Sequence, residues 1–140
     1  MAAAVLAAIV VTAAGLGSTA KAPPKFRADL SAQNEVPAPK GAPKLAGGRF
    51  VGTLKGHTLS WTLKFHTLSS GATAAHIHTG TKGQVGPVII PLCGPCSSPA
   101  SGTATVTGAQ IAALGAGNVY VNVHTAKNPN GEVRGQTYKR

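Results

Sequence analysis

Ala74-Ala75-His76-Ile77-His78-Thr79-Gly80 is the stretch from which the fold of this 140-residue chain is read. Successive side chains of a β-strand point to opposite faces, so His76 and His78 share one face while Ala75 and Ile77 share the other. At a rise of about 3.3 Å per residue, the two histidine Cβ atoms stand roughly 6.5 Å apart. Both imidazole rings can therefore reach one zinc or copper ion.

The segments around this stretch repeat the two-residue period of a β-strand. Leu59, Trp61, Leu63 and Phe65 show the clearest alternation with polar residues. Glycine and proline turns separate the segments, and the only helical pattern is one or two turns over 110–114 that end at Gly115. The predicted strands cover residues 26–30, 47–54, 59–65, 74–79, 85–92, 103–107, 119–124 and 132–138. We therefore predict a single all-β domain, an antiparallel β-sandwich or barrel of short strands.

A second polar pair has the same spacing as the first. In the predicted strand over 119–124, Tyr120, Asn122 and His124 face away from the valines. If this strand lies beside or opposite the strand of His76 and His78, three histidines converge as candidate metal ligands. Asn122 or Tyr120 would then orient a ring from outside the ligand set. The alternative is that the histidines bond to the backbone and to one another in a metal-free polar patch.

The N-terminal segment over 2–16 is almost wholly apolar, and small residues follow at Ser18, Ala20 and Ala22. This pattern predicts a signal peptide over 1–20 with cleavage near 20–22, a linker over 21–25 and a β domain over 26–138. The usual basic residues before the apolar region are missing, which leaves an upstream start, an atypical leader or a retained anchor open. We expect a secreted or extracytoplasmic protein with no stable membrane span after cleavage.

The charge balance is strongly basic, with 13 Lys and Arg against 3 Asp and Glu and a net charge of +10. Such a balance favours anionic partners, which in the cell envelope are anionic polymers; a secreted protein is another candidate partner. Only 4% of residues are aromatic, and no stacking platform or reading helix is present, so nucleic acid is excluded as a partner. The alternative is that the charge only keeps the protein soluble.

Two cysteines lie in Cys93-Gly94-Pro95-Cys96, before a run that breaks helices. Thioredoxin-type chemistry needs this motif at the start of a helix. In an oxidising compartment we therefore expect a local disulfide between Cys93 and Cys96, with thiolate metal ligation as the alternative.

Carboxylates are scarce, because Asp29, Glu35 and Glu132 are the only ones in the chain. Glu132 and Arg134 share a strand face, and a buried carboxylate requires a partner to offset its desolvation. We predict that Glu35 or Glu132 forms a structural ion pair with Arg134.

Several motifs, in order and with compatible spacing, together resemble the CHRD domain, a chordin-type family common in secreted bacterial proteins. The resemblance runs from about Phe26 to Gln136, and the chain departs from it in the inserted cysteine motif and in a lysine-rich segment before Gly47. It implies an extracytoplasmic all-β module without an established reaction. The motifs are Phe26-Arg27-Ala28-Asp29-Leu30, Gln33-Asn34-Glu35-Val36-Pro37, Ala74-Ala75-His76-Ile77-His78, Gly86-Pro87-Val88, Tyr120-Val121-Asn122-Val123-His124-Thr125 and Asn130-Gly131-Glu132-Val133-Arg134-Gly135-Gln136.

Two functions follow from these observations. The first is a non-catalytic binding or structural module, because carboxylates are few and no serine or cysteine nucleophile has a base at a recognisable spacing. The second is a copper- or zinc-binding protein that uses His76, His78 and His124. The histidine pair also resembles the ligand strand of copper/zinc superoxide dismutases, and so suggests redox chemistry, but the glycine and aspartate context of those enzymes is absent.

Overall fold

A computed structural model describes residues 20–140. The predicted signal peptide, apart from Ala20, lies outside these residues. The elements are β1 (Lys25–Ser31), the 3-10 helix η1 (Ala32–Asn34), β2 (Gly47–Lys55), β3 (Thr58–His66), β4 (Ala72–Thr79), β5 (Val88–Cys93), β6 (Ala100–Thr105), α1 (Gly108–Ala116), β7 (Val119–Thr125), β8 (Val133–Gln136) and β9 (Tyr138–Lys139).

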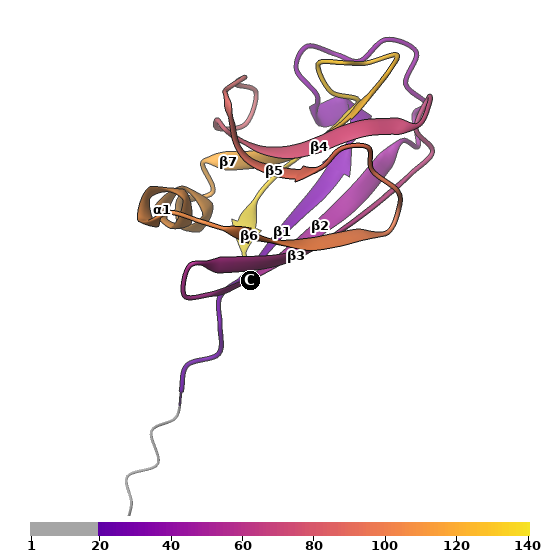
Figure 1. Ribbon diagram of the computed structural model, residues 1–140. Coiled ribbons are helices and arrows are strands. Elements are labelled where there is room, and N and C mark those ends of the chain that lie inside the picture. Colours follow the sequence, from indigo (N-terminus) through magenta and orange to yellow (C-terminus); the bar gives the residue numbers. More distant parts are fainter. Residues whose placement is uncertain (1–19) are drawn as a thin grey trace, which may run out of the picture.

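The strands form one antiparallel sheet in the order β5-β4-β7-β8-β1-β2-β3-β6, and β9 pairs with β1. The sheet curls so that β4, β5 and β7 lie over β1, β2 and β3 (Figure 1). Its end strands, β5 and β6, approach each other without pairing, so the sheet is a nearly closed barrel. The predicted all-β single domain is confirmed, and the barrel-like form is the one adopted.

The core fills the interior of the curled sheet, as the alternation in β3 predicts. Leu59, Trp61 and Leu63 are buried, while the residues between them face solvent. Closing the sheet lets side chains from strands far apart in the sequence share one apolar interior. Other fully buried members of this core are Ala28, Phe50, Ile77, Leu114, Val121, Val123 and Val133.

Strand β7 is buried on both faces, which the sequence pattern did not indicate. Val121 and Val123 pack inside the barrel, and Tyr120, Asn122 and His124 on the outer face are also buried. Two loops cover this outer face, over residues 35–40 and 80–87. The polar face of β7 is therefore an enclosed site.

The helix and the strand before it differ from their predicted bounds. Thr107 was expected in a strand, but it caps α1 in a reciprocal pair of hydrogen bonds with Gln110. The helix also passes through Gly115 and ends at Ala116, and Gly117 caps it with a φ of 72° that suits glycine. Among residues 20–140, no helix is long and apolar enough to cross a membrane.

Candidate metal centre

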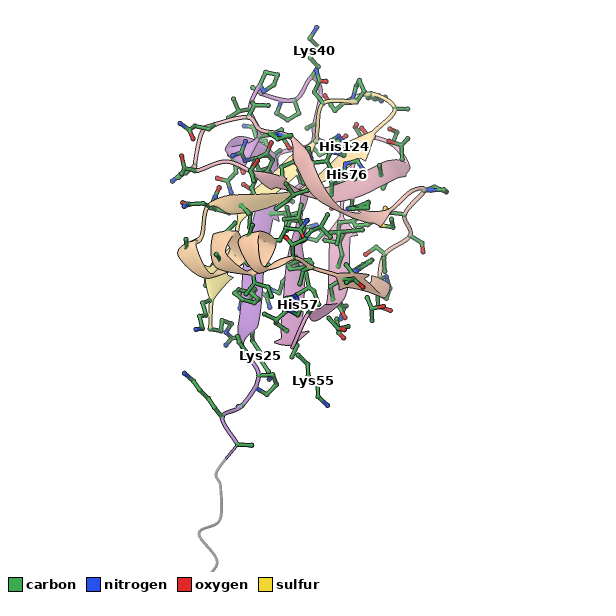
Figure 2. The ribbon with its side chains drawn as sticks, turned by 60° about the vertical axis from the view of Figure 1, so that its left-hand side comes forward. Lys25, Lys40, Lys55, His57, His76 and His124 are labelled. Carbon is green, nitrogen blue, oxygen red and sulfur yellow. A yellow bond between two sulfur atoms is a disulfide. The ribbon has the colours of Figure 1, made fainter. Side chains whose placement is uncertain are left out.

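The three candidate ligands lie on the adjacent antiparallel strands β4 and β7. The register pairs His76 with Asn122 and Ala74 with His124, so His76 and His124 are diagonal neighbours on one face. In Figure 2, His76 and His124 lie close together, away from His57. The three-histidine ligand set was predicted on the condition that these two strands lie beside or opposite each other, and in the structure they pair.

The three rings converge on a small volume. One potential ligand atom from each of His76, His78 and His124 can be chosen so that all lie within 4.8 Å of one another. His76 Nδ1 donates a hydrogen bond to His124 Nε2 at 3.1 Å, because the proton of His124 lies on Nδ1, and the ring centroids of His78 and His124 are 5.9 Å apart. This is the only such group of three or more metal-ligating side chains among residues 20–140.

Backbone carbonyls orient two of the rings. His78 Nδ1 donates to the carbonyl of Gly86 at 2.9 Å, and His124 Nδ1 donates to the carbonyl of Pro129 at 2.9 Å. A carbonyl can only accept, so Nδ1 carries the proton in both rings and Nε2 keeps its lone pair. The Nε2 of His78 is buried without a hydrogen-bond partner. Histidines that bind a metal through Nε2 are commonly held in the same way, with Nδ1–H donating to a backbone carbonyl that is not itself a ligand.

Burial lowers the pKa of all three histidines below the ordinary value of 6.5. The neighbouring histidines lower the pKa values of His76 and His124 further, whereas hydrogen bonds to Gly86 and Pro129 oppose the effect at His78 and His124. Each imidazole is therefore neutral at neutral pH, which is the form that binds metal.

Tyr120 and Arg134 form a stack on His78. The Tyr120 ring lies parallel to the His78 ring, with centroids 4.9 Å apart and an angle of 7° between the planes. The guanidinium carbon of Arg134 lies 3.4 Å from the centre of the same tyrosine ring. The Tyr120 hydroxyl accepts from the backbone N–H of Gly86, whose carbonyl also holds His78. Tyr120 thus positions His78 by stacking and through a shared backbone anchor.

Asn122 lies between the histidines and a buried carboxyl group. Its amide interacts with His78 on one side and with Glu35 on the other. Burial raises the pKa of Glu35 from 4.5 to about 7, although the N–H of Val36, the charge of Arg134 and the amide of Asn122 all oppose the rise. Asn122 Oδ1 and Glu35 Oε2 are buried without hydrogen-bond partners among the described residues.

The predicted ion pair with Arg134 does not form in this structure. The charge of Arg134 lowers the pKa of Glu35, but the two side chains do not form an ion pair. Both ion pairs found among residues 20–140 involve Asp29. Arg134 instead stacks on Tyr120 and donates from Nη2 to the carbonyl of Thr81. The prediction assumed that a buried carboxylate requires an arginine, but neutral donors and ring faces supply the compensation here.

Neutral groups satisfy Glu132, which is fully buried. It accepts hydrogen bonds from the N–H and hydroxyl of Ser69, the hydroxyl of Thr125 and the amide of Asn128. Burial by itself would raise the pKa of Glu132, but these hydrogen bonds outweigh it and hold the pKa below 4.5. Glu132 therefore anchors the loop between β7 and β8.

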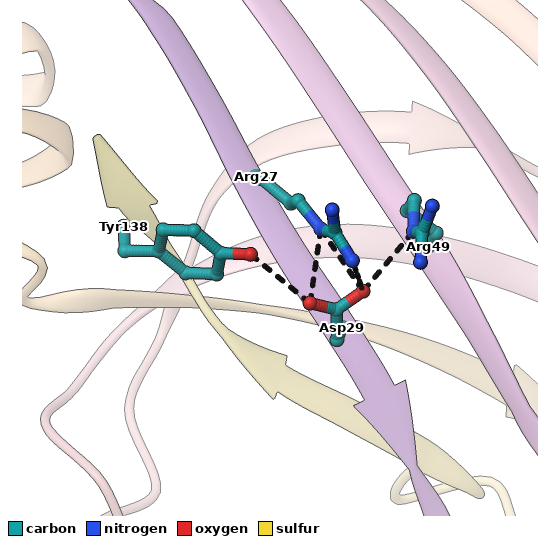
Figure 3. Close-up of polar contacts among 4 residues, drawn as sticks. All are labelled: Arg27, Asp29, Arg49 and Tyr138. Carbon is teal, nitrogen blue, oxygen red and sulfur yellow. Dashed lines mark hydrogen bonds and ion pairs between the residues drawn. The ribbon is translucent and has the colours of Figure 1, made fainter. Parts of the chain in front are cut away.

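The remaining carboxylate, Asp29, organises a polar contact on the outer face of β1 and β2. Arg27 and Arg49 donate to it from the two strands, and the Tyr138 hydroxyl donates from β9 (Figure 3). Arg27 lowers the pKa of Asp29 most strongly, through its hydrogen bonds. This contact was not predicted, although the spacing of Arg27 and Asp29 places them on one strand face.

The two cysteines form the predicted disulfide. Cys93 and Cys96 are bonded with Cα atoms 5.4 Å apart, in the connection between β5 and β6. The sulfurs are therefore not candidate metal ligands.

A cavity of about 390 Å³ opens beside the histidines. His78, His124, Tyr120 and Asn122 form its polar wall. The two covering loops and the β7–β8 loop supply the rest: Val36, Pro37, Val85, Pro129 and Asn130. Solvent can therefore reach the ring faces of the candidate metal centre.

The contacts that orient the rings were not predicted from the sequence. The carbonyls of Gly86 and Pro129 carry no side-chain signal, and the position of Arg134 over Tyr120 follows from the pairing of β7 with β8. Only the proline after Gly86 and the Asn-Pro-Asn-Gly turn marked these segments as ordered loops.

The comparison with protein-family models gave one match, to the CHRD domain, over residues 26–137. No curated protein and no solved structure matched the chain. The matched region contains β1 from Phe26 onward and all of β2 to β8, together with the disulfide and all three histidines of the cluster. The chain belongs to the CHRD domain family.

Proposed function

We propose that this protein is a non-catalytic CHRD module of the cell exterior that binds one copper or zinc ion through His76, His78 and His124. One observation carries the proposal: three neutral imidazoles from two paired strands place ligand atoms within 4.8 Å of one another. The backbone holds two of these rings with Nε2 unprotonated. Imidazole nitrogens are preferred ligands of both metals.

The geometry requires only a small closure around the ion. Metal–nitrogen bonds of about 2.0–2.1 Å in a tetrahedral arrangement separate the nitrogens by about 3.3 Å. His76 Nδ1 and His124 Nε2 lie 3.1 Å apart through a hydrogen bond, so His76 would have to change to its other tautomer before Nδ1 could bind the ion. The widest separation in the set, 4.8 Å, has to shorten by about 1.5 Å, which a change in the side-chain torsions of His78 supplies. The ion would also give the buried Nε2 of His78 the partner that it lacks.

Metal titration tests this proposal. Untagged protein is titrated with Cu(II) and with Zn(II), and the bound metal is quantified for wild type, His78→Ala and His66→Ala. His66 is exposed and lies outside the cluster, so it controls for surface histidines. We expect one equivalent in wild type and in His66→Ala, and a loss of affinity of more than about 100-fold in His78→Ala, because a ligand is removed and not only its support. Equal binding by all three proteins would overturn the proposal.

The pH dependence gives a second readout. Protons compete with metal for the ring nitrogens, so binding should fade below about pH 6. The lowered pKa values of the three histidines keep the site neutral slightly further into the acid range than free histidine. Metal uptake that does not change down to about pH 4 would exclude imidazole ligands.

Two of the three carboxylates, Glu132 and Asp29, support the non-catalytic part of the proposal, whereas Glu35, with its pKa raised to about 7, does not. Glu132 is saturated with hydrogen bonds, and Asp29 is held by two arginines. Neither is free to act as a general acid or base. The location at the cell exterior is supported by the disulfide, a bond typical of oxidising compartments, and by the predicted signal peptide. Sequencing the N-terminus of the protein recovered from its host would test the cleavage.

A second role, binding of anionic envelope polymers, is favoured by one arrangement on the outer sheet. Arg49 on β2 and Lys64 on β3 are directly opposite in the register, and both are exposed. Asp29 pairs with Arg49, whereas Lys64 has no ion-pair partner among residues 20–140 and adds a second cation beside it. Retention on an anionic polymer should fall with salt and with the double change Arg49→Gln/Lys64→Gln, but not with Lys139→Gln. Retention on the polymer that does not change with ionic strength would count against this role.

A further inference from the structure

We infer that the metal held by His76, His78 and His124 keeps an open coordination position, and that this position takes a small anion from solution. The inference rests on the proposed metal site. It adds the chemical class of an exogenous ligand and the route by which that ligand arrives.

The first step is the number of protein ligands. Among residues 20–140, the three histidines converge without a cysteine, aspartate or glutamate in their group. Zinc and copper(II) take at least four ligands, and sites with three protein ligands keep a position for water or an added molecule. A closed structural site would need a fourth side chain, which this group lacks.

The second step is access to that position. His78 and His124, though not His76, line the cavity of about 390 Å³, so two of the three ligands border a space that is already present. Val85 at its wall is 65% exposed, and Pro37 is exposed as well. The cavity therefore opens to solvent, and the loops that bear these residues limit the size of what enters.

The third step is the sign of the local charge. Arg134 is 2% exposed, has no ion-pair partner among the described residues, and lies over Tyr120, which in turn stacks on His78. The guanidinium does not line the cavity itself but lies against Tyr120, which does, so its charge and that of the metal ion both act at the wall formed by Tyr120 and His78. The Nη1 atom of Arg134 is also buried without a hydrogen-bond partner. Charge of this sign favours an anion over a neutral ligand at the open position.

The size and lining of the cavity restrict the anion. Val36, Pro37 and Val85 present apolar surface, which disfavours large hydrated ions. Asn122 offers an amide beside the ligand rings. A small monodentate anion such as azide satisfies these conditions. Its binding to copper(II) can be followed in the absorption and paramagnetic resonance spectra of the metal.

The experiment is a titration of the copper-loaded, untagged protein with sodium azide. We expect a saturable azide-to-copper charge-transfer absorption and a matching change in the Cu(II) electron paramagnetic resonance spectrum. Protein that binds copper but shows neither change would overturn this inference and leave the proposed function intact. Protein that binds no copper would overturn this inference, and protein that binds neither copper nor zinc would overturn the proposed function as well.

Two pairs of variants locate the anion. Val85→Trp narrows the cavity and should weaken azide binding without changing copper affinity, whereas Leu45→Trp, at a 77% exposed position outside the cavity, should change neither. Arg134→Met should raise the azide dissociation constant by about tenfold, while Arg134→Lys should recover part of the loss. Azide binding that all four variants leave unchanged would place the anion elsewhere and refute this site.

Discussion

Replacing the buried Glu35 by glutamine tests how its burial affects stability. The carboxyl group is 5% exposed, and its pKa is raised to about 7, mainly by desolvation. Because the folded-state pKa exceeds the unfolded-state value of 4.5, the folded protein binds more protons between these two pH values. The contribution of Glu35 to the free energy of unfolding is therefore greatest below pH 4.5 and is lost as the pH rises through about 7.

The size of this effect follows from the pKa values. A rise from 4.5 to about 7, at about 1.4 kcal/mol per pH unit, corresponds to a loss of about 3 kcal/mol of stability once the group is ionised. Glutamine has a similar shape but does not ionise, and its carbonyl oxygen can still accept from the N–H of Val36. The stability of Glu35→Gln relative to wild type should thus rise by up to about 3 kcal/mol between about pH 4 and pH 8.

Urea unfolding of both proteins across this pH range measures the difference. The titrating histidines, Asp29 and Glu132 are present in both proteins, so their contributions cancel in it. A difference that stays flat with pH would refute the reasoning, because it would mean that Glu35 is ionised normally in the folded protein.

Three further predictions concern the supports of the site and of the barrel. Arg134→Glu should lower the free energy of unfolding by about 2–4 kcal/mol, because it places an unpaired charge at a buried position. It should lower the melting temperature more than Lys139→Glu, since Lys139 is exposed, and equal melting temperatures would contradict this. Gly86→Ala should weaken Cu(II) binding by about 10–100-fold in the metal titration. The new Cβ would lie 1.9 Å from the carbonyl oxygen of Thr79, so the backbone must shift and displace the Gly86 carbonyl that holds His78. Unchanged affinity would show that this carbonyl does not position His78 for the metal. Replacing Cys93 and Cys96 by serine should cost only about 2 kcal/mol or less in thermal unfolding, because the loop that the disulfide closes is short, and a much larger loss would show that it does more.

Much of the barrel could be predicted from local patterns. The alternation of Leu59, Trp61 and Leu63 identified β3 and its buried face, and the valines of β7 identified the inner face of that strand. Helix bounds were less accurate, because Thr107 and Gly115 are compatible with two local structures and the packing of α1 decided between them. Closure into a barrel depends on strand pairing over long sequence separations, which alternation does not encode.

The candidate site was predicted in its members but not in its surroundings. His76 and His78 share a face because of strand geometry alone, and His124 was named as their partner from its spacing. The expected ion pair at Arg134 did not form, because sequence spacing specifies which residues share a strand face but not which neighbours a buried charge finds across the sheet.

The sequence by itself determined the family, the strands and the chemical types of the ligands, since these depend on residue identity and on the two-residue period of a strand. Only the tertiary structure decided that β4 pairs with β7, which brings His124 beside His76. It also decided that two loops cover the outer face of β7, which lowers the histidine pKa values, and that Gly86 in one of them and Pro129 in the β7–β8 loop supply the carbonyls that orient the rings. These properties arise from contacts between distant segments, and such contacts exist only once the barrel has formed.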